Sequence, residues 1–156
     1  MNILTQNNET VESEIESNHL NYTNELVSLF KDGFYHECIN LSEKLLENQF
    51  MNSFIMNIYG TSLSLIGKKE QAIKIFLDGL THFPKDCDLN NNLAIEYQHI
   101  GEYSKAEFYS KIAVTSNPHS SEAYFTLAVS LNLLNKVKEA TFAYQKSFKN
   151  DSKNDK

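Results

Sequence analysis

The feature of this chain that most constrains its fold is a recurrence of residue types every 34 positions. One column of the recurrence holds residues that tolerate a left-handed backbone, namely Gly33, Gly67, Gly101 and Asn135. Another column holds small side chains, namely Cys38, Ala72, Ala106 and Ala140. Four copies follow one another without a gap, over residues 19–52, 53–86, 87–120 and 121–154. Such internal repetition indicates one small supersecondary unit that is built four times and stacked.

Helix-capping residues define the start of each unit. The residue before each copy is a preferred N-cap, in order Asn18, Asn52, Asp86 and Ser120. A helix is therefore expected to begin each copy and to end at the glycine or asparagine about fourteen residues later. A second helix follows, for example from Tyr103 to about Ser116, and proline at 84 and 118 stops its continuation. The sequence thus predicts an all-α fold of stacked helix pairs.

Small side chains also recur inside the first helices, which indicates close packing within each pair. Position eight of copies two to four holds Gly60, Ala94 and Ala128, opposite the alanine column. Larger apolar residues with helical spacing surround these positions, such as Leu63, Tyr97 and Leu131. We expect the two helices of a pair to approach each other closely at the small residues.

These columns resemble the tetratricopeptide repeat, a helix-turn-helix unit of 34 residues. Beyond the small positions, the matching residues are Tyr124 at position four, Tyr59, Leu93 and Leu127 at seven, Phe76 and Tyr144 at twenty-four, and Pro84 and Pro118 at thirty-two. The resemblance covers residues 19–154 and implies an α-solenoid with a right-handed superhelix. Copy one departs most, because Leu26 and Leu45 replace small residues and Phe50 replaces proline. Residues 1–18 are expected to be an acidic leader, either disordered or a short capping helix.

The resemblance also implies a concave groove that is lined by the first helices and takes an extended peptide or a helix. The residues expected to line it are Asn24, Lys31, Asn57, Thr61, Ser64, Asn91, Asn92, Gln98, His99, Phe125 and Asn132. Carboxamides dominate this set, and each can both donate to and accept from a peptide backbone. Only Lys31 is cationic, while Asp88 and Glu122 add negative charge. A clamp for a C-terminal carboxylate is therefore disfavoured, and a polar or weakly basic ligand is expected.

Charge and composition exclude several function classes. The net charge is −6, and all 14 basic residues are lysines, so recognition of nucleic acid is not expected. No apolar run approaches the ~20 residues that a membrane helix needs, and the start of the chain lacks the pattern of a secretory signal. The expected location is therefore the cytoplasm. Cys38 and Cys87 show no metal-ligand or redox spacing.

No catalytic motif is present in the sequence. His36, His82, His99 and His119 fall at different positions of the repeat and do not converge on one helix face. A glycine-rich phosphate loop and a nucleophile elbow are both absent from the sequence. We therefore expect no enzyme activity, no catalytic residues, no metal and no cofactor.

A protein-interaction scaffold or adaptor is the function that these features favour. Two alternatives stay open, a cytosolic secretion chaperone built from such repeats and an accessory module of an enzyme such as a glycosyltransferase. No polar capping helix follows the fourth copy in this sequence, so the helix expected over 137–150 should leave apolar residues uncovered, at Ala140, Tyr144, Ser147 and Phe148. That strip predicts a weak homodimer through the C-terminal helix.

Overall fold

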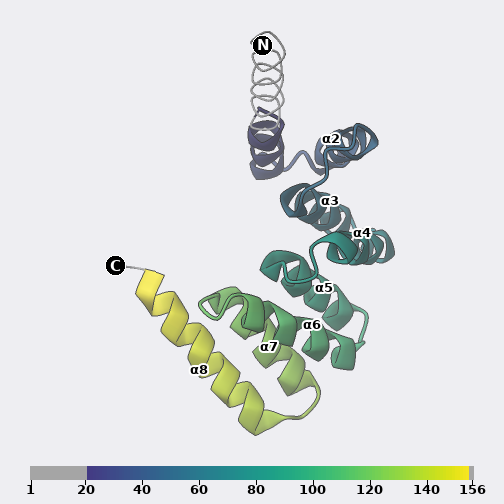
Figure 1. Ribbon diagram of the computed structural model, residues 1–156. Helices are drawn as coiled ribbons and strands as arrows, with labels where there is room; N and C mark the ends of the chain where they lie inside the picture. Colours follow the sequence, from purple (N-terminus) through teal and green to yellow (C-terminus); the bar gives the residue numbers. More distant parts are fainter. Residues whose placement is uncertain (1–20, 155–156) are drawn as a thin grey trace, which may run out of the picture.

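The computed structural model describes residues 21–154, and all of its regular elements are helices (Figure 1). After an N-terminal helix over residues 21–31, the helices are α2 (Tyr35–Glu47), α3 (Ser53–Leu65), α4 (Lys69–His82), α5 (Cys87–His99), α6 (Tyr103–Ser116), α7 (Ser121–Leu133) and α8 (Val137–Asn154). The predicted all-α solenoid is confirmed. The leader expected over residues 1–18 lies outside the described residues.

The first helices of copies two to four begin at the first residue of each copy, and the predicted caps explain why. The side chains of Asn52, Asp86 and Ser120 each accept a hydrogen bond from the backbone N–H three residues later, at 2.8, 2.9 and 3.1 Å. Each bond satisfies an N–H group that has no partner within its helix. The N-cap predictions are confirmed at these three positions, whereas Asn18 lies outside the described residues.

The turns between paired helices adopt the left-handed conformation that the sequence predicts. The φ angles are 79°, 83° and 80° at Gly33, Gly67 and Gly101, and 58° at Asn135. The structure adds one position that the repeat pattern does not predict, Gln49, where φ is 63°. Copy one has Phe50 where copies two and three have Pro84 and Pro118, and its second helix is followed by the left-handed residue Gln49.

Gly101→Ala is expected to lower the free energy of unfolding by about 1 kcal/mol, because alanine at φ near +80° is strained. A Cβ atom there would meet nothing within 4 Å, so the cost is conformational and not steric. Asn135→Gly, at the matching position of copy four, is the control and should change stability much less. Urea denaturation measures both variants. Equal effects would show that the left-handed backbone is not what selects glycine.

The small residues allow the helix pairs to pack closely. Ala72, Ala94 and Ala106 are fully buried, and a Cβ atom built on Gly60 would overlap the ring of Phe76. Phe76, on α4, therefore fills the space that glycine leaves open on α3. In copy one, larger residues occupy the interface between the helices: Leu26 and Leu45 are buried in a cluster with Cys38.

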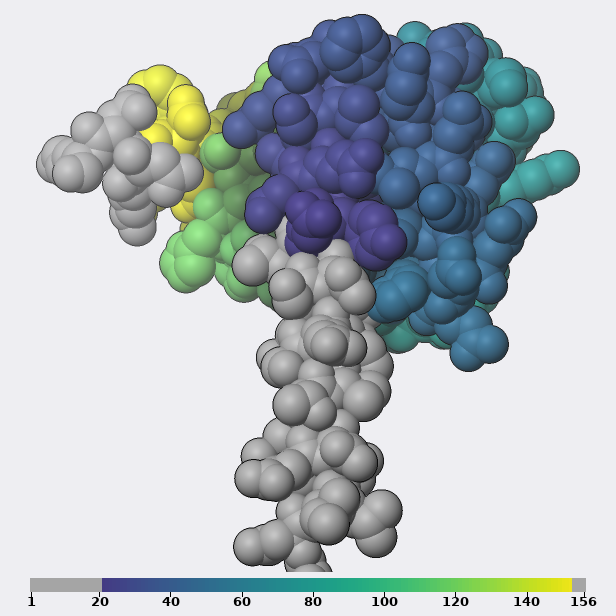
Figure 2. Space-filling model, turned by 90° about the horizontal axis from the view of Figure 1, so that it is seen from above, coloured from purple at the N-terminus to yellow at the C-terminus, as the bar shows by residue number. Residues whose placement is uncertain are grey.

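The stack curves with its first helices on the inner side. Among the described elements, the backbones of α3 and α5 and of α5 and α7 approach within 8 Å, measured between Cα atoms, whereas those of α2 and α4, α4 and α6, and α6 and α8 do not. Figure 1 shows the pairs stepping from the N-terminal helix at the top to α7 and α8 at the bottom. Viewed from the N-terminal side, the end of α8 projects to one side of the remaining helices (Figure 2). The concave surface therefore belongs to the first helices.

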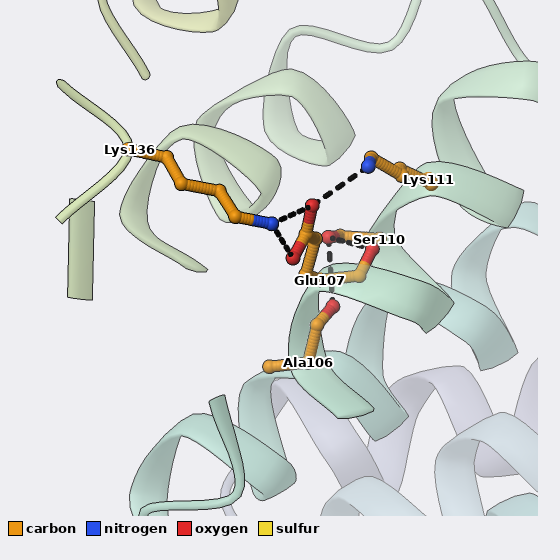
Figure 3. Close-up of polar contacts among 5 residues, drawn as sticks. All are labelled: Ala106, Glu107, Ser110, Lys111 and Lys136. Atoms are coloured by element: carbon orange, nitrogen blue, oxygen red, sulfur yellow. Dashed lines mark hydrogen bonds and ion pairs between the residues drawn. The ribbon is translucent and has the colours of Figure 1, made fainter. Parts of the chain in front are cut away.

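One buried carboxylate links separate helices at the C-terminal half of the stack. Glu107 on α6 accepts hydrogen bonds from Lys136 Nζ, in the turn before α8, at 2.6 and 2.8 Å, and from Lys111 Nζ at 2.7 Å (Figure 3). Burial by itself raises the pKa of Glu107, but the hydrogen bonds and charges of both lysines outweigh it and hold that pKa below its ordinary value. The Glu107–Lys136 ion pair holds the turn between α7 and α8 against α6.

Candidate peptide-binding groove

A hollow of about 320 Å³ lies on the concave surface, where four first helices come together. Its wall contains Phe30, Asn57, Ile58, Thr61, Asp88, Asn91, Asn92 and Glu122. Four of the residues that the sequence places in the groove, Asn57, Thr61, Asn91 and Asn92, therefore lie around one hollow. The repeat brings them together because α3 and α5 are neighbours on the inner side.

The carboxamides in this wall bind each other across adjacent helices. Asn92 Nδ2 on α5 donates to Asn57 Oδ1 on α3 at 2.5 Å and lies 3.4 Å from Thr61 Oγ1. This hydrogen bond holds neighbouring repeats together and also fixes the orientation of both amides. Asn92 Oδ1 and Asn57 Nδ2 are not used in it, so an acceptor and a donor remain for a ligand.

Acidic side chains form the next part of the wall. Asn91 Nδ2 on α5 donates to Glu122 Oε1 on α7 at 3.2 Å. Burial, together with the negative charge of Asp86, raises the pKa of Asp88 above its ordinary value. Asp86 and Asp88 also line a smaller adjoining hollow of about 80 Å³ with Ser53, Phe54 and Asn57. Among the side chains of residues 21–152, neither Asp88 nor Glu122 has a salt-bridge partner.

Other predicted groove residues at the far ends of the first helices have structural hydrogen bonds. Gln98 Nε2 donates to the Thr126 carbonyl oxygen and to Ser130 Oγ, both at 2.9 Å, which uses both of its hydrogens. Ser64 Oγ donates to Glu96 Oε1 at 2.5 Å, and His99 Nδ1 lies 3.7 Å from the same oxygen. Gln98 and Ser64 therefore join neighbouring repeats.

The remaining predicted residues lie outside the hollow. Asn24, Lys31 and Asn132 are exposed on first helices, and Phe125 packs edge-on against Tyr144 of α8, with ring centroids 5.8 Å apart. The structure brings none of them into the wall around Asn91 and Asn92. The eleven predicted groove residues thus separate into a central hollow, a set of inter-repeat contacts and exposed positions.

Three residues of the inner surface were not predicted from the sequence, and the first of them is Ile58, which lines the hollow. Phe30 stands at position twelve of copy one, a groove position, and it lines the hollow. Glu96 is buried at position ten, where copies two and four carry the buried residues Ser62 and Ser130. A column of buried small polar side chains interrupted by one glutamate is a signal that could have identified it.

The C-terminal helix exposes only part of the strip that the sequence predicts. Tyr144 is 37% exposed and Phe148 is 76% exposed. Ala140, however, is buried against α7, so the prediction is wrong at that residue. Ser147 is half-buried and donates to the Ser121 carbonyl oxygen at 2.8 Å. Ala140 and Ser147 lie on the face that α8 turns toward α7. Tyr144 touches Phe125 of α7 at the edge of that face and stays partly exposed, and Phe148 is the most exposed of the four.

Neither a metal centre nor a membrane segment emerges from residues 21–154. Within that range no group of three or more His, Cys, Asp and Glu side chains could hold a metal ion. None of the helices there combines the length and the apolar character needed to cross a bilayer.

Among known proteins, this chain resembles solved structures, and the resemblance is one of fold. No protein-family model matches the sequence, and no curated protein shows significant similarity to it. A crystal structure of MamA superposes with a TM-score of 0.76 at 17% identity, covering 94% of this chain and 85% of that one. A MamA fragment from Desulfovibrio magneticus RS-1 gives 0.73 at 17% identity, with 86% and 76% covered. The second TPR of Spaghetti (RPAP3), bound to the HSP90 peptide SRMEEVD, gives 0.60 at 23% identity, with 62% and 89% covered.

Proposed function

Because this chain has the tetratricopeptide-repeat fold, we propose that it is a non-enzymatic scaffold or adaptor of the cytoplasm that binds a peptide segment of a partner protein in its concave groove. The observation that carries the proposal is the hollow of about 320 Å³ among the first helices. Its amides offer a donor and an acceptor to a backbone, and its carboxylates suit a polar or weakly basic segment. The same negative charge argues against nucleic acid.

The chemistry of the wall favours this function over a secretion chaperone, and an experiment separates it from an accessory enzyme module. A secretion chaperone has to cover apolar segments of its client, but amide, hydroxyl and carboxylate groups make up most of this wall. An accessory module of an enzyme such as a glycosyltransferase would use the groove or the convex face to hold the catalytic chain. That alternative predicts an activity that appears only when an enzyme is added, whereas a scaffold binds isolated peptides.

Thr61→Tyr is expected to weaken peptide binding at least tenfold, because the larger ring would fill the hollow without changing its charge. The matched control is Thr115→Tyr, at an exposed threonine of α6 that lines a separate surface depression with Phe108 and Ile112. Peptides selected from a randomised library against the wild-type protein are titrated into both variants by fluorescence anisotropy. Binding that survives Thr61→Tyr but is lost in Thr115→Tyr would place the site outside the groove and contradict the proposal.

We also propose weak self-association of two copies through α8. Position 24 is buried in the interior second helices, at Phe76 and Ser110, and α8 exposes its residue there, Tyr144, together with Phe148. Two aromatic side chains cannot approach the ~1,200 Å² of a stable interface, so only a weak dimer is expected. Phe148→Lys should remove concentration-dependent dimerisation in analytical ultracentrifugation, while Phe108→Lys, at another exposed phenylalanine, should not. A wild-type protein that stays monomeric at millimolar concentration would exclude the dimer.

A further inference from the structure

Two carboxylates in the wall of the hollow favour a positively charged ligand group. Asp88 and Glu122 belong to different helices, α5 and α7, and both contribute to its wall. An ionised carboxylate only accepts hydrogen bonds, and neither group has a cationic partner within the described residues. Asp88 is an exposed residue, and the partial burial of its carboxyl group together with the negative charge of Asp86 raises its pKa.

A buried amide in the same wall adds to this preference. Asn91 is 4% exposed, and its Nδ2 donates to Glu122 Oε1. The carboxylate fixes the orientation of the amide, because the opposite orientation would place Oδ1 against a negatively charged oxygen. Asn91 Oδ1 then has no hydrogen-bond partner within the described residues. Asn91 lines the same hollow as both carboxylates, and its unpaired carbonyl dipole adds negative potential there.

Two apolar side chains also line the hollow, one of them aromatic. Phe30, from the N-terminal helix, lines it together with Ile58. The negative face of a phenyl ring attracts a cation that lies within ~6 Å of its centroid. The hollow holds about ten times the ~30 Å³ that one water molecule occupies in the liquid, so it can accept the end of a long side chain.

We propose that this hollow is a recognition site for one cationic side chain, lysine or arginine, of a bound peptide, with Asp88 and Glu122 as its charged contacts. The proposal rests on the proposed function, since the side chain arrives on a peptide in the groove. It adds the chemistry that the partner must carry. The aliphatic stem of the side chain passes Ile58 and Phe30, and its charge lies near the two carboxylates.

Acidic residues in the first turn of a helix also stabilise the helix itself, because they interact with its dipole. Asp88 and Glu122 hold that position in α5 and α7. Glu37 and Glu70 lie in the first turns of α2 and α4; all four residues are exposed, but Glu37 and Glu70 do not line the hollow. The double variant Asp88→Asn with Glu122→Gln removes both carboxylates of the hollow. The control is the double variant Glu37→Gln with Glu70→Gln, which removes the same net charge from the first turns of two other helices and leaves the hollow intact.

The experiment uses three pools of nonapeptides that are randomised except for a central lysine, norleucine or glutamate. Norleucine keeps most of the lysine stem and lacks its charge. Binding of each pool is measured on the full-length protein at two salt concentrations, with chemical shifts of the Asn91 side-chain amide as the local readout. The lysine pool is expected to bind the wild type about tenfold more tightly than the norleucine pool, the effect of two partly exposed charge contacts.

Each outcome decides the proposal. It is supported if Asp88→Asn with Glu122→Gln removes the preference for lysine while Glu37→Gln with Glu70→Gln retains it. It is overturned if wild-type protein binds the lysine and norleucine pools equally, although groove binding itself would then stand. Equal loss of the preference in both double variants would assign it to net charge and also overturn the site. If no pool shifts the groove resonances, the proposed function fails together with the inference.

Discussion

Replacing Phe76 by alanine is expected to lower the free energy of unfolding by about 3–5 kcal/mol, the usual cost of removing a buried phenylalanine ring. Phe76 is only 1% exposed, and it belongs to the cluster that joins α3, α4 and α5 through Met56, Leu63 and Leu93. Alanine would leave a cavity at the centre of the stack. Chemical denaturation monitored by circular dichroism measures the change, and the milder Phe76→Leu gives a folded comparison if the alanine variant does not fold.

A double-mutant cycle with Gly60 tests the reason for this cost. Gly60→Ala alone is expected to destabilise the protein, because the added methyl group would overlap the Phe76 ring. In the Phe76→Ala background the ring is absent, and alanine is favoured over glycine in a helix by ~1 kcal/mol. The effect of Gly60→Ala should therefore change sign. If it destabilises both backgrounds equally, the ring is not what keeps position 60 small.

The repeat could be predicted from the sequence because local physics fixes its columns. A capping side chain at Asn52, Asp86 or Ser120 and a left-handed residue at Gly67 or Gly101 determine where a helix begins and ends within a few residues of chain. The small residues at 60, 72, 94 and 106 act between two helices that the chain connects directly. Each requirement recurs every 34 residues, so the agreement of several columns identifies the fold.

The inner surface was harder to predict because its contacts cross from one repeat to the next. The sequence placed Asn57, Asn91 and Asn92 on the groove side, and they line the hollow. It did not indicate that Asn92 would bind Asn57, or that Gln98 would use both of its hydrogens on Thr126 and Ser130. Those pairings depend on the offset between stacked helices, which no single repeat determines. The same offset places Phe30 around one hollow with residues of α5 and α7.

The second large effect is expected at Glu107. Glu107→Gln should lower the free energy of unfolding by about 1–2 kcal/mol at neutral pH, because the carboxylate accepts charge-assisted hydrogen bonds from Lys111 and Lys136 and its side chain is only 11% exposed. The estimate lies below the sum of three such bonds, since both lysines reach solvent. Glu102→Gln is the control, because Glu102 and Lys105 form a pair 3.5 Å apart that is exposed on both sides.

The pH dependence of that difference identifies its cause. The folded-state pKa of Glu107 lies below its ordinary value of 4.5, so the carboxylate contributes stability that is fully present above the unfolded-state pKa. That contribution is lost as the pH falls below about 4.5 and through the folded-state pKa. The difference between wild type and Glu107→Gln should therefore be constant from pH 6 to 8 and shrink in acid. A difference that persists unchanged at pH 3 would assign the effect to packing around Ala106 and Ser110, and would remove the ion pair as the contact that holds the last turn of the solenoid.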